Sequence, residues 1–93
     1  MKFEWDESKA DANLKKHGVS FEEAKTVFDN PMAIIFDDEA HSIDEQREII
    51  IGHSRENRLL LVSFTDRSIS VRIISARLVT RKEREDYEQN AFQ

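Results

Sequence analysis

The first third of the chain alternates hydrophobic and polar positions at the spacing of α-helices. After the short extended segment "KFEW", Asp6 is placed to cap a helix that continues through Lys16, and Gly18 is suited to the left-handed turn that ends many helices. The apolar side of this helix is predicted to consist of Ala10, Leu14 and His17. We therefore predict a first amphipathic helix directly after a short strand.

A second helix is predicted directly after the first. Ser20 and Glu23 in "SFEE" match a capping box, in which each residue satisfies a free backbone amide of the other. Pro31 in "DNP" cannot continue a helix and ends this one. The apolar stripe of the second helix is formed by Phe21, Ala24 and Phe28.

The middle of the chain has the pattern of β-strands. Four runs rich in β-branched and aromatic residues follow one another: "MAIIF", "QREIIIGHS", "RLLLVSFTD" and "SISVRIISA". The polar loop "DDEAHSID" separates the first two, and the short breaks "SREN" and "DRS" separate the others. Breaks of this length favour hairpins, so we predict an antiparallel meander.

A last helix follows the strands. Thr80 and Glu83 match a second capping box, which opens the helical segment "RKEREDYEQNAF". Its apolar residues are few, so packing is expected to hold this helix weakly: Tyr87, Ala91 and Phe92. The pattern as a whole predicts an α+β fold, with an antiparallel sheet of four to five strands, two N-terminal helices packed on it and a C-terminal helix.

Composition narrows the class of protein. Ninety-three residues suit one domain, which we place at residues 1–93. The chain has no cysteine, and its three histidines are scattered, so we expect no disulfide, no metal site and no cofactor. No apolar run approaches the roughly 18 residues that span a bilayer. We expect a soluble protein of the cytoplasm that has no membrane partner.

The net charge of −5 conceals a strong segregation of charge along the chain. Residues 1–46 carry 5 lysines and arginines against 12 acidic residues, a net charge of −7. Residues 47–84 carry 9 against 4, a net charge of +5, and all but one of these cations are arginines. Because the planar guanidinium group suits phosphate and carboxylate, the second half is expected to present an anion-binding surface.

The stretch "SVRIISAR" raises the question of what its arginines bind. Strict strand alternation places Arg72 and Arg77 on opposite faces, so they share a face only if a bulge intervenes near Ser75. Arg47 alternates with two isoleucines of an earlier strand. Each arginine alone is most simply a salt-bridged surface residue, whereas the set at 47, 72, 77 and 81 suits a phosphate.

Candidates for proton transfer are fewer. The loop "HSIDEQR" brings His41, Asp44, Glu45 and Arg47 within seven positions, although a lone loop histidine is most often only solvated. Tyr87 is the aromatic residue that we expect to be partly exposed.

Three stretches together resemble the BrnT family of bacterial toxins: "FEWDESKADANLKKHGVSFEEAKTVFDNP", "HSIDEQREIIIGHS" and "RIISARLVTRKEREDYE". The resemblance implies a RelE-like ribonuclease fold and a type II toxin that cleaves RNA and arrests translation. It also implies a BrnA-like antitoxin as partner in a hetero-oligomer, through which the complex would contact DNA only indirectly.

The resemblance carries over to individual residues. It implies catalytic roles for Arg72, Arg77, Arg47, His41, Glu45 and Tyr87, and RNA binding by Arg81, Lys82 and Arg84, with Glu83 also matching. Ribonucleases of this kind need no metal, because the 2′-hydroxyl of the RNA is the nucleophile and arginines stabilise the phosphorane. The general base stays open among His41, Glu45 and Tyr87. The alternative is an inactive relative that serves only as binding partner and co-repressor of its antitoxin.

Overall fold

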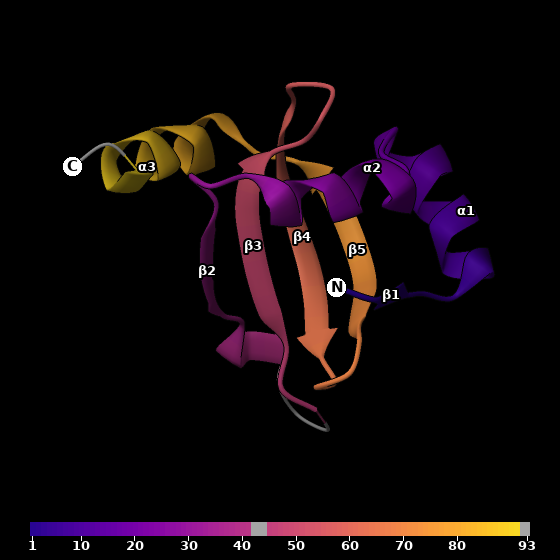
Figure 1. The fold of residues 1–93 in the computed structure, drawn as a ribbon. Coiled ribbons are helices and arrows are strands. Elements are labelled where there is room, and N and C mark those ends of the chain that lie inside the picture. Colours follow the sequence, from indigo (N-terminus) through magenta and orange to yellow (C-terminus); the bar gives the residue numbers. More distant parts are fainter. Residues whose placement is uncertain (42–44, 92–93) are drawn as a thin grey trace.

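The computed structural model describes residues 1–41 and 45–91, without the side chains of His41 and Ala91. Within these residues, three α-helices, two 3-10 turns and five strands follow one another (Figure 1). The elements are β1 (Phe3–Glu4), α1 (Glu7–His17), α2 (Phe21–Lys25), η1 (Thr26–Asp29), β2 (Ile34–Asp37), η2 (Glu39–His41), β3 (Glu48–His53), β4 (Leu59–Asp66), β5 (Val71–Leu78) and α3 (Arg81–Ala91).

The strands form one sheet in the order β1-β5-β4-β3-β2. The predicted antiparallel meander is confirmed for β2 to β5, whereas β1 pairs in parallel with β5, so the sheet is mixed. From β1 at one edge of the sheet, the chain runs through α1, α2 and η1 to β2 at the other edge (Figure 1). The predicted α+β class is confirmed.

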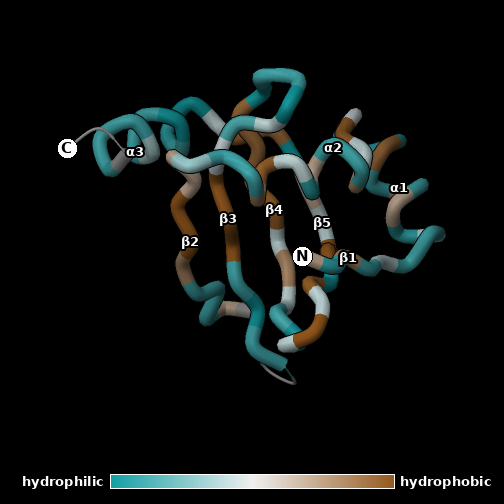
Figure 2. Tube along the Cα trace, viewed as in Figure 1, coloured by the Kyte–Doolittle hydropathy of each residue, from teal (hydrophilic) through white to brown (hydrophobic). Residues whose placement is uncertain are grey.

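The main core lies between the sheet and the α1–α2–η1 segment. Figure 2 shows the hydrophobic stretches concentrated in the strands, while α1 and α3 are largely hydrophilic. Phe28 joins the two layers, because its ring meets Phe3 at 5.1 Å and Phe64 at 5.0 Å between centroids, edge to face in both cases. The buried residues of this core are Val19, Phe21, Ala24, Val27, Ile50, Leu60, Val62, Phe64, Val71, Ile73 and Ala76.

Helix α1 has the predicted caps but a different buried face. Asp6 accepts a hydrogen bond from the amide of Lys9, and Gly18 adopts the left-handed conformation with φ of 69°. The expectation that Leu14 lies on the buried stripe is wrong, because Leu14 is 50% exposed and the neighbouring Asn13 is buried instead.

The reason for this change is a hydrogen-bonding demand of β5. Strand β1 pairs with β5 only at Val71 and Arg72, which leaves the edge of β5 open further on. The side chain of Asn13 fills this gap, since Nδ2 donates to the carbonyl of Ala76 (2.8 Å) and Oδ1 accepts from the amide of Ala76 (3.1 Å). Nδ2 also donates to the carbonyl of Val19 at 2.9 Å. These three hydrogen bonds satisfy the buried side chain of Asn13. A leucine at this position could not hydrogen-bond to the open backbone groups of Ala76.

A β-bulge interrupts the pairing of β4 with β5. Ser63 pairs with Ser75, but the next residue of β4, Phe64, pairs with Ile73. Ile74 is therefore the extra residue on β5, and the alternation of side chains shifts by one position there. The bulge lies next to Ser75, the place where the sequence required one if Arg72 and Arg77 were to share a face.

The capping box of α2 is only half formed, because its glutamate has a second partner. Ser20 accepts from the amide of Glu23 (3.0 Å), but the carboxylate of Glu23 turns to Arg58, which binds it through Nε and Nη2. Ser54 donates to the same carboxylate (2.7 Å), and Arg58 Nη2 also donates to the carbonyl of Gly18 (3.0 Å). The hydrogen bond from Arg58 lowers the pKa of Glu23, against the opposing effect of burial. This network joins the helices to the β3–β4 hairpin.

None of the helices within the described ranges has the length and apolar character needed to cross a membrane.

We expect Arg58→Ala to lower the free energy of unfolding by about 2 kcal/mol, because it removes charge-assisted hydrogen bonds from a buried carboxylate. Glu23 is only 8% exposed, whereas Arg58 is 37% exposed, so water replaces part of the loss. Urea unfolding followed by circular dichroism at pH 7 measures the difference. Arg55→Ala is the matched control, since this exposed arginine lies in the same hairpin. Equal losses in both variants would contradict a structural role for the Arg58–Glu23 pair.

Candidate functional site

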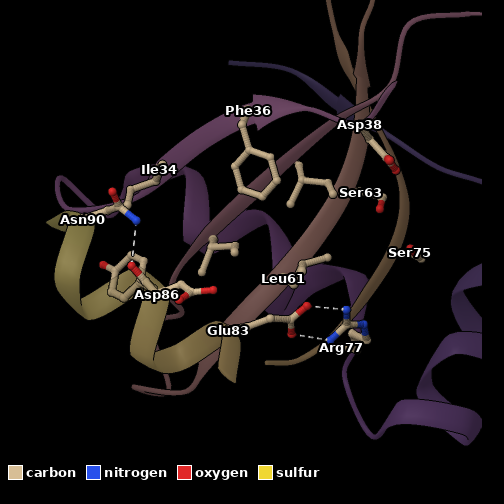
Figure 3. Close-up of a pocket in the computed structure, with 13 residues that line it drawn as sticks. Ile34, Phe36, Asp38, Leu61, Ser63, Ser75, Arg77, Glu83, Asp86 and Asn90 are labelled. Atoms are coloured by element: carbon tan, nitrogen blue, oxygen red, sulfur yellow. Dashed lines mark hydrogen bonds and ion pairs between the residues drawn. The ribbon is translucent and has the colours of Figure 1, made fainter. Parts of the chain in front are cut away.

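The face of the sheet that α1 and α2 leave uncovered carries a groove beneath α3, with a volume of about 520 Å³ (Figure 3). Strands β2 to β5 form its floor and α3 forms one wall. The lining residues are Ile34, Phe36, Asp38, Ile49, Ile51, Leu61, Ser63, Ser75, Arg77, Glu83, Asp86, Tyr87 and Asn90.

The bulge at Ile74 decides which residues of β5 face this groove. Before the bulge, Arg72 pairs with Thr65; after it, Arg77 pairs with Leu61. Thr65 and Leu61 are four residues apart on the regular strand β4, so both arginines face the same side of the sheet. The buried residues of β5 agree, because Val71 and Ile73 share the main core with Ala76, which has the opposite parity.

The register aligns the side chains on this face of the sheet in three rows. The first two rows line the groove, whereas the third contributes only Asp38 to the lining and continues along the sheet from its end. The apolar row, nearest α3, consists of Ile34, Ile51, Leu61 and Arg77. The serine row consists of Phe36, Ile49, Ser63 and Ser75. The arginine row continues the same register and consists of Asp38, Arg47, Thr65 and Arg72, with the amide of Asp38 donating to the carbonyl of Arg47 at 2.9 Å. Polarity therefore rises from α3 toward the far end, as the colours of β2 and β3 show in Figure 2.

Arg77 holds an internal carboxylate. Its Nη1 and Nη2 donate to Oε1 and Oε2 of Glu83 at 2.8 and 2.9 Å, as Figure 3 shows. Glu83 also accepts from the amide of Thr80 (2.8 Å), and Thr80 accepts from the amide of Glu83 (3.1 Å), so the predicted second capping box is confirmed. The Arg77 hydrogen bonds lower the pKa of Glu83 to about 2, and Glu83 in turn raises the pKa of Arg77.

Tyr87 is buried, so the expectation that its ring is partly exposed is wrong. It is 3% exposed and packs with Ile51, Leu59 and Leu61. Its hydroxyl donates to the carbonyl of Met32 at 2.9 Å, and burial raises its pKa. Among the described side chains of α3, Tyr87 is the only buried one, in agreement with the otherwise hydrophilic surface of the helix. Its proton is engaged in a hydrogen bond that fixes α3 to the turn before β2.

Arg72 has a different environment from Arg77. It is half-buried, and its guanidinium group makes no hydrogen bond or ion pair to any residue in the ranges 1–41 and 45–91. Beside it, Thr65 donates to Glu45 Oε1 at 3.4 Å, and Arg67 donates to Glu45 Oε2 at 3.2 Å. Glu45 therefore lies at the arginine row, where Thr65 has the carboxylate of Glu45 on one side and Arg72 on the other.

The remaining candidates lie around this groove or outside the described residues. His41 ends η2, and its side chain and residues 42–44, including Asp44, lie outside the described part of the chain. On α3, Arg81 is 94% exposed and pairs with Glu85 at 3.4 Å, and Lys82 is 80% exposed and pairs with Asp86 at 3.2 Å.

Arg84, the third predicted RNA-binding residue, is exposed on α3, and its guanidinium group has no partner among the described residues. Sequence reasoning did not single out the groove residues Phe36, Ser63 and Ser75. The sequence shows the alternation within each strand, but it does not show the register between strands that aligns these three residues.

Within the described ranges, no group of three or more histidine, cysteine, aspartate or glutamate residues is arranged to hold a metal ion.

Comparison with known proteins finds ribonuclease toxins of one family. The family model described as "Ribonuclease toxin, BrnT, of type II toxin-antitoxin system" matches residues 5–83. The crystal structure of the Brucella abortus ribonuclease toxin BrnT is similar, with a TM-score of 0.68 and 26% sequence identity, covering 87% of this chain and 99% of that chain. No curated protein sequence matches the chain.

The Arg77–Glu83 pair generates a pH-dependent prediction. Because the pKa of Glu83 falls from an ordinary value near 4.5 to about 2 on folding, its stabilising effect is complete above pH 4.5 and is lost as the pH falls toward 2. We expect the free energy of unfolding of the wild type to fall more steeply over this range than that of Glu83→Gln. Urea titrations at several pH values measure both slopes.

Glu88→Gln serves as the matched control, because Glu88 is an exposed glutamate of the same helix. This variant should keep the wild-type slope, while Glu83→Gln flattens it. A Glu83→Gln protein with an unchanged slope would show that the ion pair does not stabilise the folded chain.

Proposed function

Since the chain belongs to the BrnT family of ribonuclease toxins of type II toxin–antitoxin systems, we propose that it is a metal-independent endoribonuclease whose active site is the groove beneath α3. The observation that carries the proposal is the bulge at Ile74. It brings Arg72 to the groove face, where this guanidinium group has no partner among the described residues. A half-buried arginine in that state is suited to an anion from outside, and the anion that a ribonuclease binds is a phosphate.

The chemistry proposed for the groove needs no metal. The 2′-hydroxyl of one nucleotide attacks the adjacent phosphorus, a base removes the hydroxyl proton, and the P–O5′ bond breaks as an acid protonates the leaving oxygen. The products are a 2′,3′-cyclic phosphate and a free 5′-hydroxyl. The negative charge on the non-bridging oxygens grows in the transition state, so a positioned guanidinium group accelerates this step.

We assign the roles by position along the groove. Arg72 and Arg47 of the arginine row bind the scissile phosphate, and Glu45 beside Thr65 acts as the base. His41 is our candidate for the acid, on the evidence of the sequence alone. Arg77 lies about 13 Å from Arg72 along the sheet. This distance follows from their partners Leu61 and Thr65, which are four residues apart on β4 at about 3.3 Å per residue.

Because of this separation, the two arginines do not both bind the non-bridging oxygens of one phosphate. Arg77, already paired with Glu83, is assigned to a neighbouring phosphate and to the position of α3. Tyr87 supports the groove by anchoring the helix, and its raised pKa makes it the weakest of the three candidate bases.

The exposed cations of α3 provide a path to the groove. Arg81, Lys82 and Arg84 lie on the helix that forms its wall, so RNA bound in the groove would pass beside them. Phosphate contacts of this kind dominate affinity and weaken with salt.

The cellular role that we propose follows from family membership. Cleavage of RNA in the cytoplasm would inhibit translation, and a BrnA-like antitoxin would neutralise the chain in a hetero-oligomer that contacts DNA only through the antitoxin. The alternative is an inactive relative that serves as the antitoxin's co-repressor. The internal neutralisation of Arg77 by Glu83 is the observation that favours this alternative.

We expect Arg72→Ala to slow RNA cleavage by about 100-fold or more, since it removes a charge that stabilises the transition state. Arg72→Lys should restore part of the rate, because a point charge replaces the planar fork only partly. The measurement is cleavage of a single-stranded RNA by the purified chain in the presence of EDTA, with folding checked by circular dichroism.

Arg55→Ala is again the control, because Arg55 is an exposed arginine outside the groove. An unchanged rate in Arg72→Ala would contradict the assigned site, and loss of cleavage in EDTA would contradict metal independence. A folded wild type that cleaves no RNA would favour the co-repressor alternative.

We expect Arg84→Ala to reduce the salt dependence of RNA binding, because one phosphate contact is lost. For single strands, the slope of log K against log salt concentration should become shallower by about 0.7. Binding of an RNA with methylated 2′-hydroxyls, which cannot be cleaved, gives the slope between low and moderate salt. Lys16→Ala, on α1 and therefore far from the groove wall, should leave the slope unchanged; the same change in both variants would rule out a specific role for α3.

A further inference from the structure

We propose that Phe36 is a nucleobase-binding subsite: the base of a nucleotide bound in the groove stacks on its ring. The inference rests on the proposed function, in which RNA is the substrate. It adds a contact to a base, whereas the arginines of the site contact only phosphate. It therefore concerns how the groove holds a nucleotide beyond its phosphate.

The exposure of Phe36 is the first observation. The other aromatic side chains that the structure describes are either buried or packed against the main core or under α3. Phe36 is 44% exposed, and it lies on β2, the edge strand that forms the outer rim of the groove. Figure 3 shows its ring lying over the floor of the groove. An aromatic face left open in a concave site is available for stacking.

The neighbours of Phe36 in the serine row are the second observation. Ser63 and Ser75 line the groove in the same row, and neither hydroxyl hydrogen-bonds to a residue of the described ranges. A hydroxyl both donates and accepts, so each can meet the polar edge of any base or a ribose hydroxyl. The row thus offers a ring for the face of a base and two hydroxyls for its edge.

The distance to the cationic side chains is the third observation. The serine and arginine rows are two residues apart along β2, β3 and β4, about 7 Å, and three residues apart on the bulged strand β5. Neighbouring strands are about 4.8 Å apart. Arg47 is on the strand next to Phe36 and one row away, so their backbones are separated by roughly 8 Å. One nucleotide can place its base on Phe36 and its phosphate in the arginine row.

These features favour RNA over a protein segment as the occupant of this part of the groove. An apolar side chain of a partner would bury the ring of Phe36, but it would leave the hydroxyls of Ser63 and Ser75 without partners. A base satisfies both kinds of group, because it has an apolar face and a polar edge. Stacking is also tolerant of sequence, since every base has such a face.

The test uses two probes of equal length: a mixed-sequence RNA with every 2′-hydroxyl methylated, and a chain of abasic sugar phosphates. Removal of a stacking side chain typically weakens binding by about 5- to 150-fold. We therefore expect Phe36→Leu to bind the RNA at least about fivefold more weakly than wild type, and the abasic chain equally well. Ile35→Ala is the control, because Ile35 is the adjacent, 53% exposed residue on the other face of β2. It should match wild type with both probes.

Phe36→Trp provides a second readout that does not depend on loss of binding. Its fluorescence, corrected for Trp5 with the wild type as reference, should be quenched by the RNA and not by the abasic chain. Unchanged RNA affinity in Phe36→Leu together with absence of quenching in Phe36→Trp would overturn the subsite while leaving RNA cleavage intact.

Failure of the wild type to bind or cleave RNA would instead overturn the proposed function, and the subsite with it. If Phe36→Leu binds RNA normally but loses its co-expressed antitoxin in a pull-down, the ring contacts a protein and the subsite is overturned.

Discussion

The extra residue in β5 is the constraint on which the rest of the groove depends. With regular alternation, Arg72 would face the main core and Ile73 would face the groove, which would bury an unpaired guanidinium group at high cost. The insertion of Ile74 gives both residues a suitable environment. Asn13 bonds to Ala76 two residues beyond the bulge, so the edge of β5 is hydrogen-bonded on both sides of the irregularity.

The glutamates of the two capping boxes each have two structural roles. In each, the glutamate at the third helical position also binds an arginine from the sheet: Glu23 binds Arg58 and Glu83 binds Arg77. A residue that begins a helix therefore also fixes where that helix docks. The first pair joins the helices to the hairpin behind the main core, and the second sets α3 over the groove. In both pairs the arginine lowers the pKa of the glutamate, so the docked state is the charged state.

Local patterns in the sequence were sufficient for the elements and their ends, because caps, turns and strand alternation are properties of neighbouring residues. Asp6, Gly18, Ser20 and Thr80 all act as predicted. The patterns could not show that Asn13 replaces Leu14 on the buried face, since that depends on how far β1 extends along β5. Nor could they place Phe36 beside the two serines, because the register of four strands aligns them. The family resemblance, rather than periodicity, identified the ribonuclease toxin.

The pairing of the first strand with the last has a consequence for the order of folding. Asn13 and Ala76 are separated by 63 positions, and β1 meets β5 across a similar interval, whereas each of the strands β2 to β5 pairs with the next one along the chain. Contacts of high sequence separation form late, because loop closure must precede them. During synthesis α1 and α2 emerge before β2 to β5, and the surface on which they dock is complete only when β5 has left the ribosome. The groove and the core behind it are thus completed together, once β5 joins the sheet.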